Sequence, residues 1–303
     1  MKLEDANIDI ESIKTIAEEL SSDNLKLIHE KYCGSVEQIL MMIASPLILM
    51  TFAMSKVKED HLSIQSAVKL GFLLNNPPKE PKVTAKQLVK FFDEELKKAN
   101  ENIVEDAQSE SNKLYEKSDE IKNCFNNIGL NALVNSWTLF EAYSKDIWVK
   151  LLNDNPQLLT QKVINTKSEN DNGVNGKTLP LNILSKYNYD VSRHLGEILS
   201  VKYDFTGVEG IKKAFKDLFN LEDHEISFLN ETKIMQLEIC RHIIVHNAGL
   251  IDSRYLARSK RPNEIINQKL QLDIIEINDM INYSINCVKQ TLLLADKKNK
   301  QPQ

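Results

Sequence analysis

The segment EICRHIIVHNAG, residues 238–249, holds the residue types in this chain that are best suited to chemistry. Arg241 stands in an otherwise apolar stretch, and His242 and His246 lie about one helical turn apart beside it. A charged side chain in apolar surroundings is costly unless another group pairs with it. Arg241 therefore indicates either a partner carboxylate or a bound anion.

We consider three kinds of site for these residues. In the first, Arg241 forms an ion pair with Glu141, which also interrupts an apolar stretch (LFEAY). In the second, Glu238, His242 and His246 hold a metal, but the outer two would lie about 12 Å apart along a helix, too far for one zinc ion with ~2 Å bonds. In the third, arginine binds a phosphate and histidine transfers protons. The spacing excludes the metal and leaves the other two open.

The segment RHIIVHNAGLID resembles the Rx4–6H signature of the HEPN superfamily (higher eukaryotes and prokaryotes nucleotide-binding). Arg241 and His246 match its two defining positions, and HNAG is similar to the H-N-x-G continuation of a bacterial group. The stretch LVNSWTLFEAYSKDIWVKLL around Glu141 resembles the helix that these domains place against the motif. The resemblance covers roughly residues 85–295, and it implies a small helical bundle that is, in many members, a metal-independent ribonuclease.

The resemblance also implies a mechanism that needs no metal and no cofactor. The 2′-hydroxyl of RNA attacks the phosphate, His246 transfers a proton, and Arg241 binds the phosphate and stabilises its developing charge. Asn247 would position groups by hydrogen bonds, with His242 and Glu141 in support. Two protomers would pair so that both motifs face one cleft, and the product would carry a 2′,3′-cyclic phosphate.

A basic cluster follows the motif and comprises Arg254, Arg258, Lys260 and Arg261, with Tyr255 among them. These residues could hold an RNA backbone and stack a base. A solvated basic loop is the simpler alternative, since runs of charge usually mean exposure.

The resemblance places such a ribonuclease in a toxin–antitoxin or anti-phage defence system, with RNA as substrate, a homodimer as the active form, and an antitoxin or defence protein as partner. The alternative function is a non-catalytic HEPN-like helical module. Such a module would bind RNA, a nucleotide or a partner protein and would keep the motif only as structure.

Composition narrows the class of protein further. The chain has 303 residues, a formal net charge of −5 and four scattered cysteines. The acidic balance argues against coating nucleic acid by bulk charge, and the cysteine spacing argues against a disulfide framework or a zinc knuckle. Acidic residues soon after Met1 do not resemble a secretion signal. We therefore expect a cytoplasmic protein.

Helical periodicity dominates the chain, which contains only 9 glycines and 8 prolines. The sequence predicts an all-α fold, a HEPN-like helical bundle with an additional N-terminal helical portion. The prolines of NNPPKEP, residues 75–81, cannot continue a helix. We expect three parts, namely an N-terminal portion of unassigned role over residues 1–75, the bundle over 82–296, and a polar tail over 297–303.

The predicted helices cover residues 8–20, 24–33, 39–54, 61–74, 131–152, 192–199, 208–219, 226–247 and 272–295, with one or two more between 83 and 127. On the motif helix, the predicted core arc holds Ile234, Leu237, Cys240, Ile244, Val245 and Ala248. Residues 166–177 and 249–263 are predicted loops.

The run Ile39–Met54 is apolar throughout, apart from Ser45, Pro46 and Thr51. Its 16 residues fall short of the ~20 that a membrane-spanning helix needs. We therefore expect a buried helix kinked at Pro46, with no membrane partner. Membrane contact is the alternative.

Overall fold

The computed structural model describes residues 8–75, 103–158, 181–259 and 264–300, together with residues 90, 94, 97 and 261. These residues form helices and turns and contain no strand, apart from one antiparallel bridge between Leu250 and Lys269. The predicted all-α helical bundle is therefore confirmed.

The chain divides into two compact units. Residues 1–6 and 41–128 form the first, and residues 7–40 and 129–303 form the second. The predicted boundary at residues 75–81 lies almost wholly outside the described residues. Instead, residues 8–40 of the predicted N-terminal portion belong to the unit that holds the motif.

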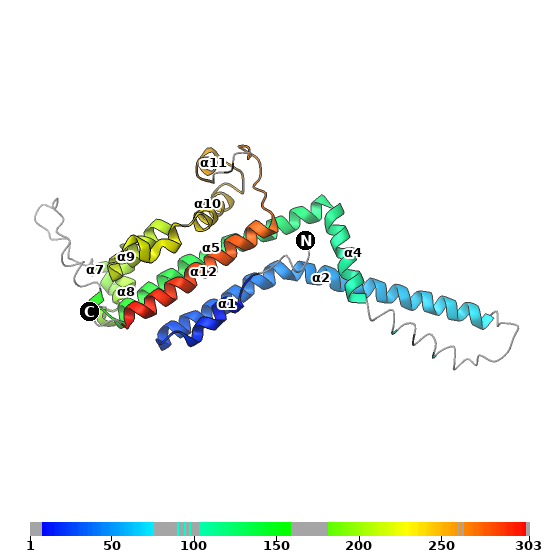
Figure 1. Ribbon diagram of the computed structural model, residues 1–303, viewed down its shortest axis with the longest axis horizontal. Coiled ribbons are helices and arrows are strands. Elements are labelled where there is room, and N and C mark those ends of the chain that lie inside the picture. The colour runs from blue at the N-terminus through cyan, green and yellow to red at the C-terminus, as the bar shows by residue number, and fades with distance from the viewer. Residues whose placement is uncertain are drawn as a thin grey trace, which may run out of the picture. The chain divides into compact units, whose positions relative to one another are not determined.

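Two long helices form the centre of the second unit. The part of α5 (Asp119–Asp154) beyond residue 128 packs beside α12 (Ile274–Asn299), as Figure 1 shows. A hydrogen bond joins the buried hydroxyls of Ser136 and Ser284, and Gly129 leaves room for Ile277. The motif helix α10 (Thr232–His246) packs against α12 and against α11 (Ser253–Ser259).

The N-terminal segment is anchored to α12. It forms α1 (Glu11–Lys14) and the 3-10 helix η2 (Thr15–Glu18) in place of the single predicted helix. Ile13 and Ile16 are fully buried. The Asp296 carboxylate on α12 accepts hydrogen bonds from the backbone N–H groups of Ser21 and Ser22, just before α2 begins. Such an acceptor stabilises the start of a helix.

One continuous helix, α2 (Asp23–Asn75), replaces the three separate helices predicted between residues 24 and 74. Pro46 lies inside it. A proline removes a single backbone donor, and here the helix continues on both sides of it. Ile39, Ile43 and Leu47 are buried, whereas Met41, Ile48, Leu49 and Phe52 are exposed. The prediction of a buried helix is therefore wrong for much of this run.

The helix α2 is also the one described helix that is long and apolar enough to cross a membrane, by length and composition alone. Its candidate span is Asp23–Lys69, and only 22% of the most apolar 18-residue window is buried. Most of this window is thus not buried against the other described residues.

In the first unit, α4 (Ile103–Lys117) lies near α2, and Lys58 of α2 forms an ion pair of 3.6 Å with Asp106. The break between α4 and α5 falls at Ser118, because the Ser118 hydroxyl accepts the Ile121 N–H and starts the new helix. The ring of Tyr115 meets that of Phe125 edge to face across this break.

The remaining described helices are α7 (Leu181–Lys186), α8 (Val191–Ser200), α9 (Val208–Phe219) and the 3-10 helix η3 (Asp223–Asn230). The bounds of α9 are those predicted. The predicted loop at residues 166–177 lies outside the described residues. Helix α12 continues through the start of the predicted tail to Asn299, because Lys298 forms an ion pair of 2.7 Å with Glu225.

Candidate functional site

The motif helix α10 packs by one face. Ile234, Leu237, Ile239, Cys240 and Ile243 are its buried residues. The predicted core arc was wrong at its C-terminal end. Val245 is exposed, and Ala248 is also exposed and lies beyond the end of the helix at φ 51°. As a result, the last turn of α10 has an open side next to Arg241 and His246.

Arg241 and His246 meet on this open side. The Arg241 Nη1 and the His246 Nε2 lie 3.4 Å apart. Because guanidinium nitrogens only donate, this contact requires Nε2 of a neutral His246 to be the acceptor. His246 is exposed, whereas Arg241 is half-buried and its buried Nε has no hydrogen-bond partner. The pair thus joins a cation and an imidazole without a carboxylate between them.

Glu141, on α5, bonds to a different partner from the one predicted. Its Oε1 accepts a 2.5 Å hydrogen bond from the Trp137 indole N–H. Burial raises the pKa of Glu141, and this effect outweighs the Trp137 hydrogen bond and the charge of Arg241, which lower it. Among the described residues, Arg241 has no acid within the 4.0 Å of an ion pair. Glu141 therefore influences Arg241 through space, not by direct contact.

His242 lies beside the pair. Its ring centroid is 4.9 Å from that of His246. Partial burial is the main cause that lowers the pKa of His242, followed by its histidine neighbour and Arg254. The lowered pKa favours the neutral form of His242 at neutral pH.

Glu238, the third residue of the rejected metal triad, forms a 3.6 Å ion pair with Arg258 and accepts the Val208 N–H at the start of α9. Burial is the main cause that raises the pKa of Glu238. Among the residues the structure describes, no three metal-binding side chains converge. Glu238 thus stabilises the contact of α10 with α9 and α11.

The end of α10 is held by its own residues. The Gly249 N–H bonds back to the Ile243 carbonyl at 2.9 Å, and Gly249 has φ 75°, a conformation that favours glycine. The Asn247 amide donates to the Leu250 carbonyl at 2.5 Å. In this structure, Asn247 therefore positions the turn after His246.

The predicted basic cluster separates into two groups. Tyr255 is 1% exposed, and its hydroxyl donates to Glu264 at 3.2 Å. Arg261 bonds to Glu264 at 3.3 Å and to Glu276 at 2.5 Å. The prediction that Tyr255 stacks a base is wrong in this structure, because its ring lies in the core.

Arg254 and Arg258 are exposed. They remain candidates for RNA contacts, although Arg258 also forms an ion pair with Glu238. Lys260 lies outside the described residues. The two acids that pair with Arg261 are Glu264 and Glu276, which follow it by 3 and 15 positions. No pattern in the sequence indicated the pair with Glu276.

Sequence reasoning also missed Trp137, which the pattern indicated only as core. Its ring is fully buried, yet its N–H fixes Glu141, a carboxylate that the charge of Arg241 influences. A buried tryptophan N–H usually finds a partner. A glutamate one helical turn after a tryptophan is the pattern that could have indicated this bond.

Comparisons with protein-family models, with curated proteins and with solved structures found no match for this chain.

Proposed function

We propose that this chain is a metal-independent endoribonuclease of the HEPN type. The observation that carries the proposal is the 3.4 Å contact between Arg241 and His246 on the open side of α10, without a paired carboxylate. A structural arginine would be expected to reach an acid, because unpaired burial of its charge is costly. An arginine that binds phosphate needs an open donor surface instead.

In the proposed reaction, the 2′-oxygen of RNA attacks the adjacent phosphorus and the bond to the 5′-oxygen breaks. One imidazole acts as a base and takes the 2′ proton, and a second group acts as an acid and protonates the leaving oxygen. Arg241 donates to the phosphate oxygens where negative charge develops. The products are a 2′,3′-cyclic phosphate and a 5′-hydroxyl, so no water is consumed in this step.

The surroundings of the pair fit this chemistry. His242 is neutral and adjacent, and Glu141 is held away from Arg241 by Trp137. Arg254 is an exposed cation on α11, the helix packed against α10. We assign Arg254 and Arg258 to the RNA backbone. A toxin or anti-phage defence effector is the biological role that we propose for such an activity.

The first test replaces His246 by Asn, which keeps a polar side chain of similar size. The rate of cleavage of a single-stranded RNA should fall at least about 100-fold, the usual contribution of a general acid or base. His224→Asn is the matched control, because His224 is also exposed but lies on η3. Unchanged cleavage by His246→Asn, or no cleavage by the wild type, would favour the non-catalytic binding module.

Each chain has one motif histidine, whereas the reaction uses a base and an acid. We therefore propose that two copies form the active site, as the resemblance implies. Wild-type and His246→Asn chains are unfolded together and refolded as an equimolar mixture, so that about half of the dimers are mixed and hold a single motif histidine. Because a mixed dimer lacks either the acid or the base, RNA cleavage per wild-type chain should fall to about half of that of the wild type alone. Cleavage per wild-type chain that does not change would mean that each chain works alone.

A further inference from the structure

The first unit exposes a set of apolar side chains that the proposed function does not use. Met41, Ile48, Leu49 and Phe52 are 65%, 47%, 65% and 69% exposed. At about 100° per residue they fall within one arc of α2, which we call the apolar face. Ile43 and Leu47, on the opposite side of the helix, are buried. A contiguous exposed apolar surface usually marks a binding site.

The apolar face lies in a run without charge. From Gln38 to Ser55, 18 residues carry no acid or base, and Glu37 and Lys56 bound the run. Its helical length of about 27 Å approaches the ~30 Å hydrocarbon core of a bilayer. The side that holds Ile43 and Leu47 is nevertheless covered by protein. Farther along α2, Val57, Ile64 and Val68 are also exposed, so the helix is covered only on the side of Ile43 and Leu47. A helix with an exposed apolar side can lie in a membrane surface with that side buried among the lipids.

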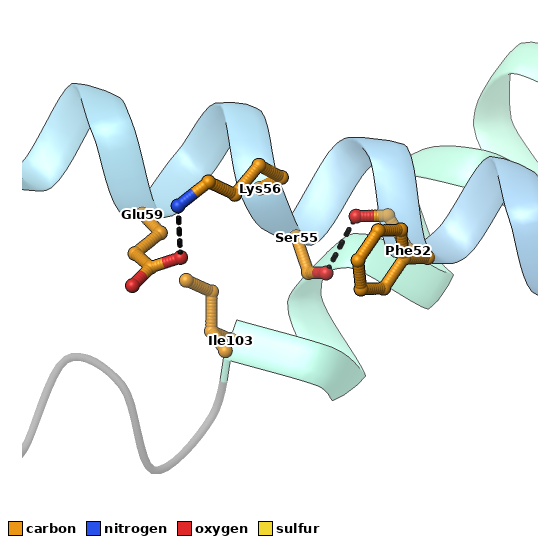
Figure 2. A pocket seen from close by; sticks show the side chains of 5 residues that line it. All are labelled: Phe52, Ser55, Lys56, Glu59 and Ile103. Carbon is orange, nitrogen blue, oxygen red and sulfur yellow. Dashed lines mark hydrogen bonds and ion pairs between the residues drawn. The ribbon is translucent and has the colours of Figure 1, made fainter.

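The C-terminal end of the face adjoins a small hollow between α2 and α4. Its volume is about 260 Å³, and its lining residues are Phe52, Ser55, Lys56, Glu59 and Ile103. Figure 2 shows the Lys56 ammonium turned to Glu59, 2.9 Å away, beside the Ile103 side chain. Asp60 also lies 3.5 Å from Lys56. Lys58, two residues farther on, is likewise paired with Asp106 at 3.6 Å. Because both lysines are paired with acids, they offer little attraction to anionic lipid.

We propose that the apolar face of α2 binds the surface of a lipid bilayer, with Leu49 and Phe52 inserted among the acyl chains. A second copy of the chain is the less suitable occupant. A stable protein interface takes about 20–30 residues from each side, and this face offers far fewer. A bilayer accepts apolar side chains without shape complementarity, and the binding grows with the apolar area buried. The chain is thus a peripheral membrane protein, whether or not it cleaves RNA.

The experiment is flotation of the full chain with vesicles of pure phosphatidylcholine. The wild type should float with the vesicles, and 0.5 M sodium chloride (about a fivefold increase over ~0.1 M) should not release it, because the contact is apolar. The double variant Leu49→Glu, Phe52→Glu should lose at least about tenfold in binding. Ile275→Glu is the control, since Ile275 on α12 is 65% exposed but outside this face.

Circular dichroism checks that the double variant unfolds at the same temperature as the wild type, and sedimentation gives the oligomeric state of each. Equal flotation of both proteins would overturn the proposal, as would a wild type that stays with the soluble fraction. A wild-type dimer that the double variant converts to monomer, without binding to vesicles, would assign the face to a second copy instead.

Discussion

Arg241 is five residues before His246, so their Cα positions do not share one face of α10. The long arginine side chain spans this difference and brings Nη1 to 3.4 Å from the imidazole. Half of the arginine lies against apolar neighbours while its charged end reaches the open side, as long cationic side chains commonly do. The apolar residues around Arg241 in the sequence are thus compatible with an accessible guanidinium.

A substitution at Glu141 distinguishes a structural ion pair from a phosphate site. Glu141→Gln keeps an oxygen that can accept the Trp137 N–H. Because burial raises the pKa of Glu141, folding favours its neutral form. This contribution of Glu141 to the free energy of unfolding is present at pH values below the ordinary glutamate pKa. It is lost as the pH rises through the raised pKa of Glu141 in the folded protein. At pH 7 the Gln variant should therefore unfold at the same temperature as the wild type or slightly higher.

The stability difference between the two proteins should narrow as the pH falls below about 4, where both side chains are neutral. Thermal unfolding followed at pH 7 and pH 4 measures this directly. A loss of about 3–5 kcal/mol at pH 7 would show that Glu141 and Arg241 form a buried ion pair, and it would contradict the assignment of Arg241 to phosphate.

The sequence indicated Arg241 and His246 through their resemblance to the Rx4–6H signature, and the structure places their side chains 3.4 Å apart. It did not predict the fate of Tyr255 or Arg261. Their acceptors, Glu264 and Glu276, lie in and beyond a loop whose path depends on the pairing of residues 249–251 with 267–270. Local patterns contain no information on such distant partners.

At the scale of elements, periodicity located most helices but not their continuity. Pro46 predicted a kink, yet α2 runs on for 53 residues. The predicted helices stop at residue 127 and start again at 131, yet α5 passes through Gly129 between them, because the missing side chain makes room for Ile277 on α12. In α5, this tertiary packing outweighs the local preference.

Gly196 tests the close packing of α8 on α5. A Cβ at this buried position would lie 2.3 Å from the Val149 carbonyl oxygen, a backbone atom that cannot turn away. Gly196→Ala should therefore destabilise the protein by about 1–3 kcal/mol. Gly34→Ala is the matched control in the exposed part of α2, with no atom within 4 Å of a new Cβ.

The control substitution Gly34→Ala should stabilise the protein by up to ~1 kcal/mol, because alanine is a better helix former than glycine. Urea unfolding curves of the two variants measure the difference. Equal effects of both substitutions would show that α8 does not approach α5 as closely as described.

At the scale of the whole molecule, the sequence predicted the all-α class but not the division into units. The unit boundaries fall at residues 40/41 and 128/129, inside the helices α2 and α5. No cluster of prolines or glycines marks either boundary, because each falls within a continuous helix. The run Ile39–Met54 was ambiguous for a similar reason, because apolar composition does not distinguish a core helix from one with an exposed apolar face.

The ends of the RNA fragments test the central claim most directly. Purified wild-type protein is incubated with a defined single-stranded RNA in excess EDTA, and the new termini are identified by mass spectrometry. The account predicts cleavage that yields 2′,3′-cyclic phosphate and 5′-hydroxyl ends and that disappears in His246→Asn. Fragments with 3′-hydroxyl and 5′-phosphate ends, or cleavage that EDTA abolishes, would contradict it.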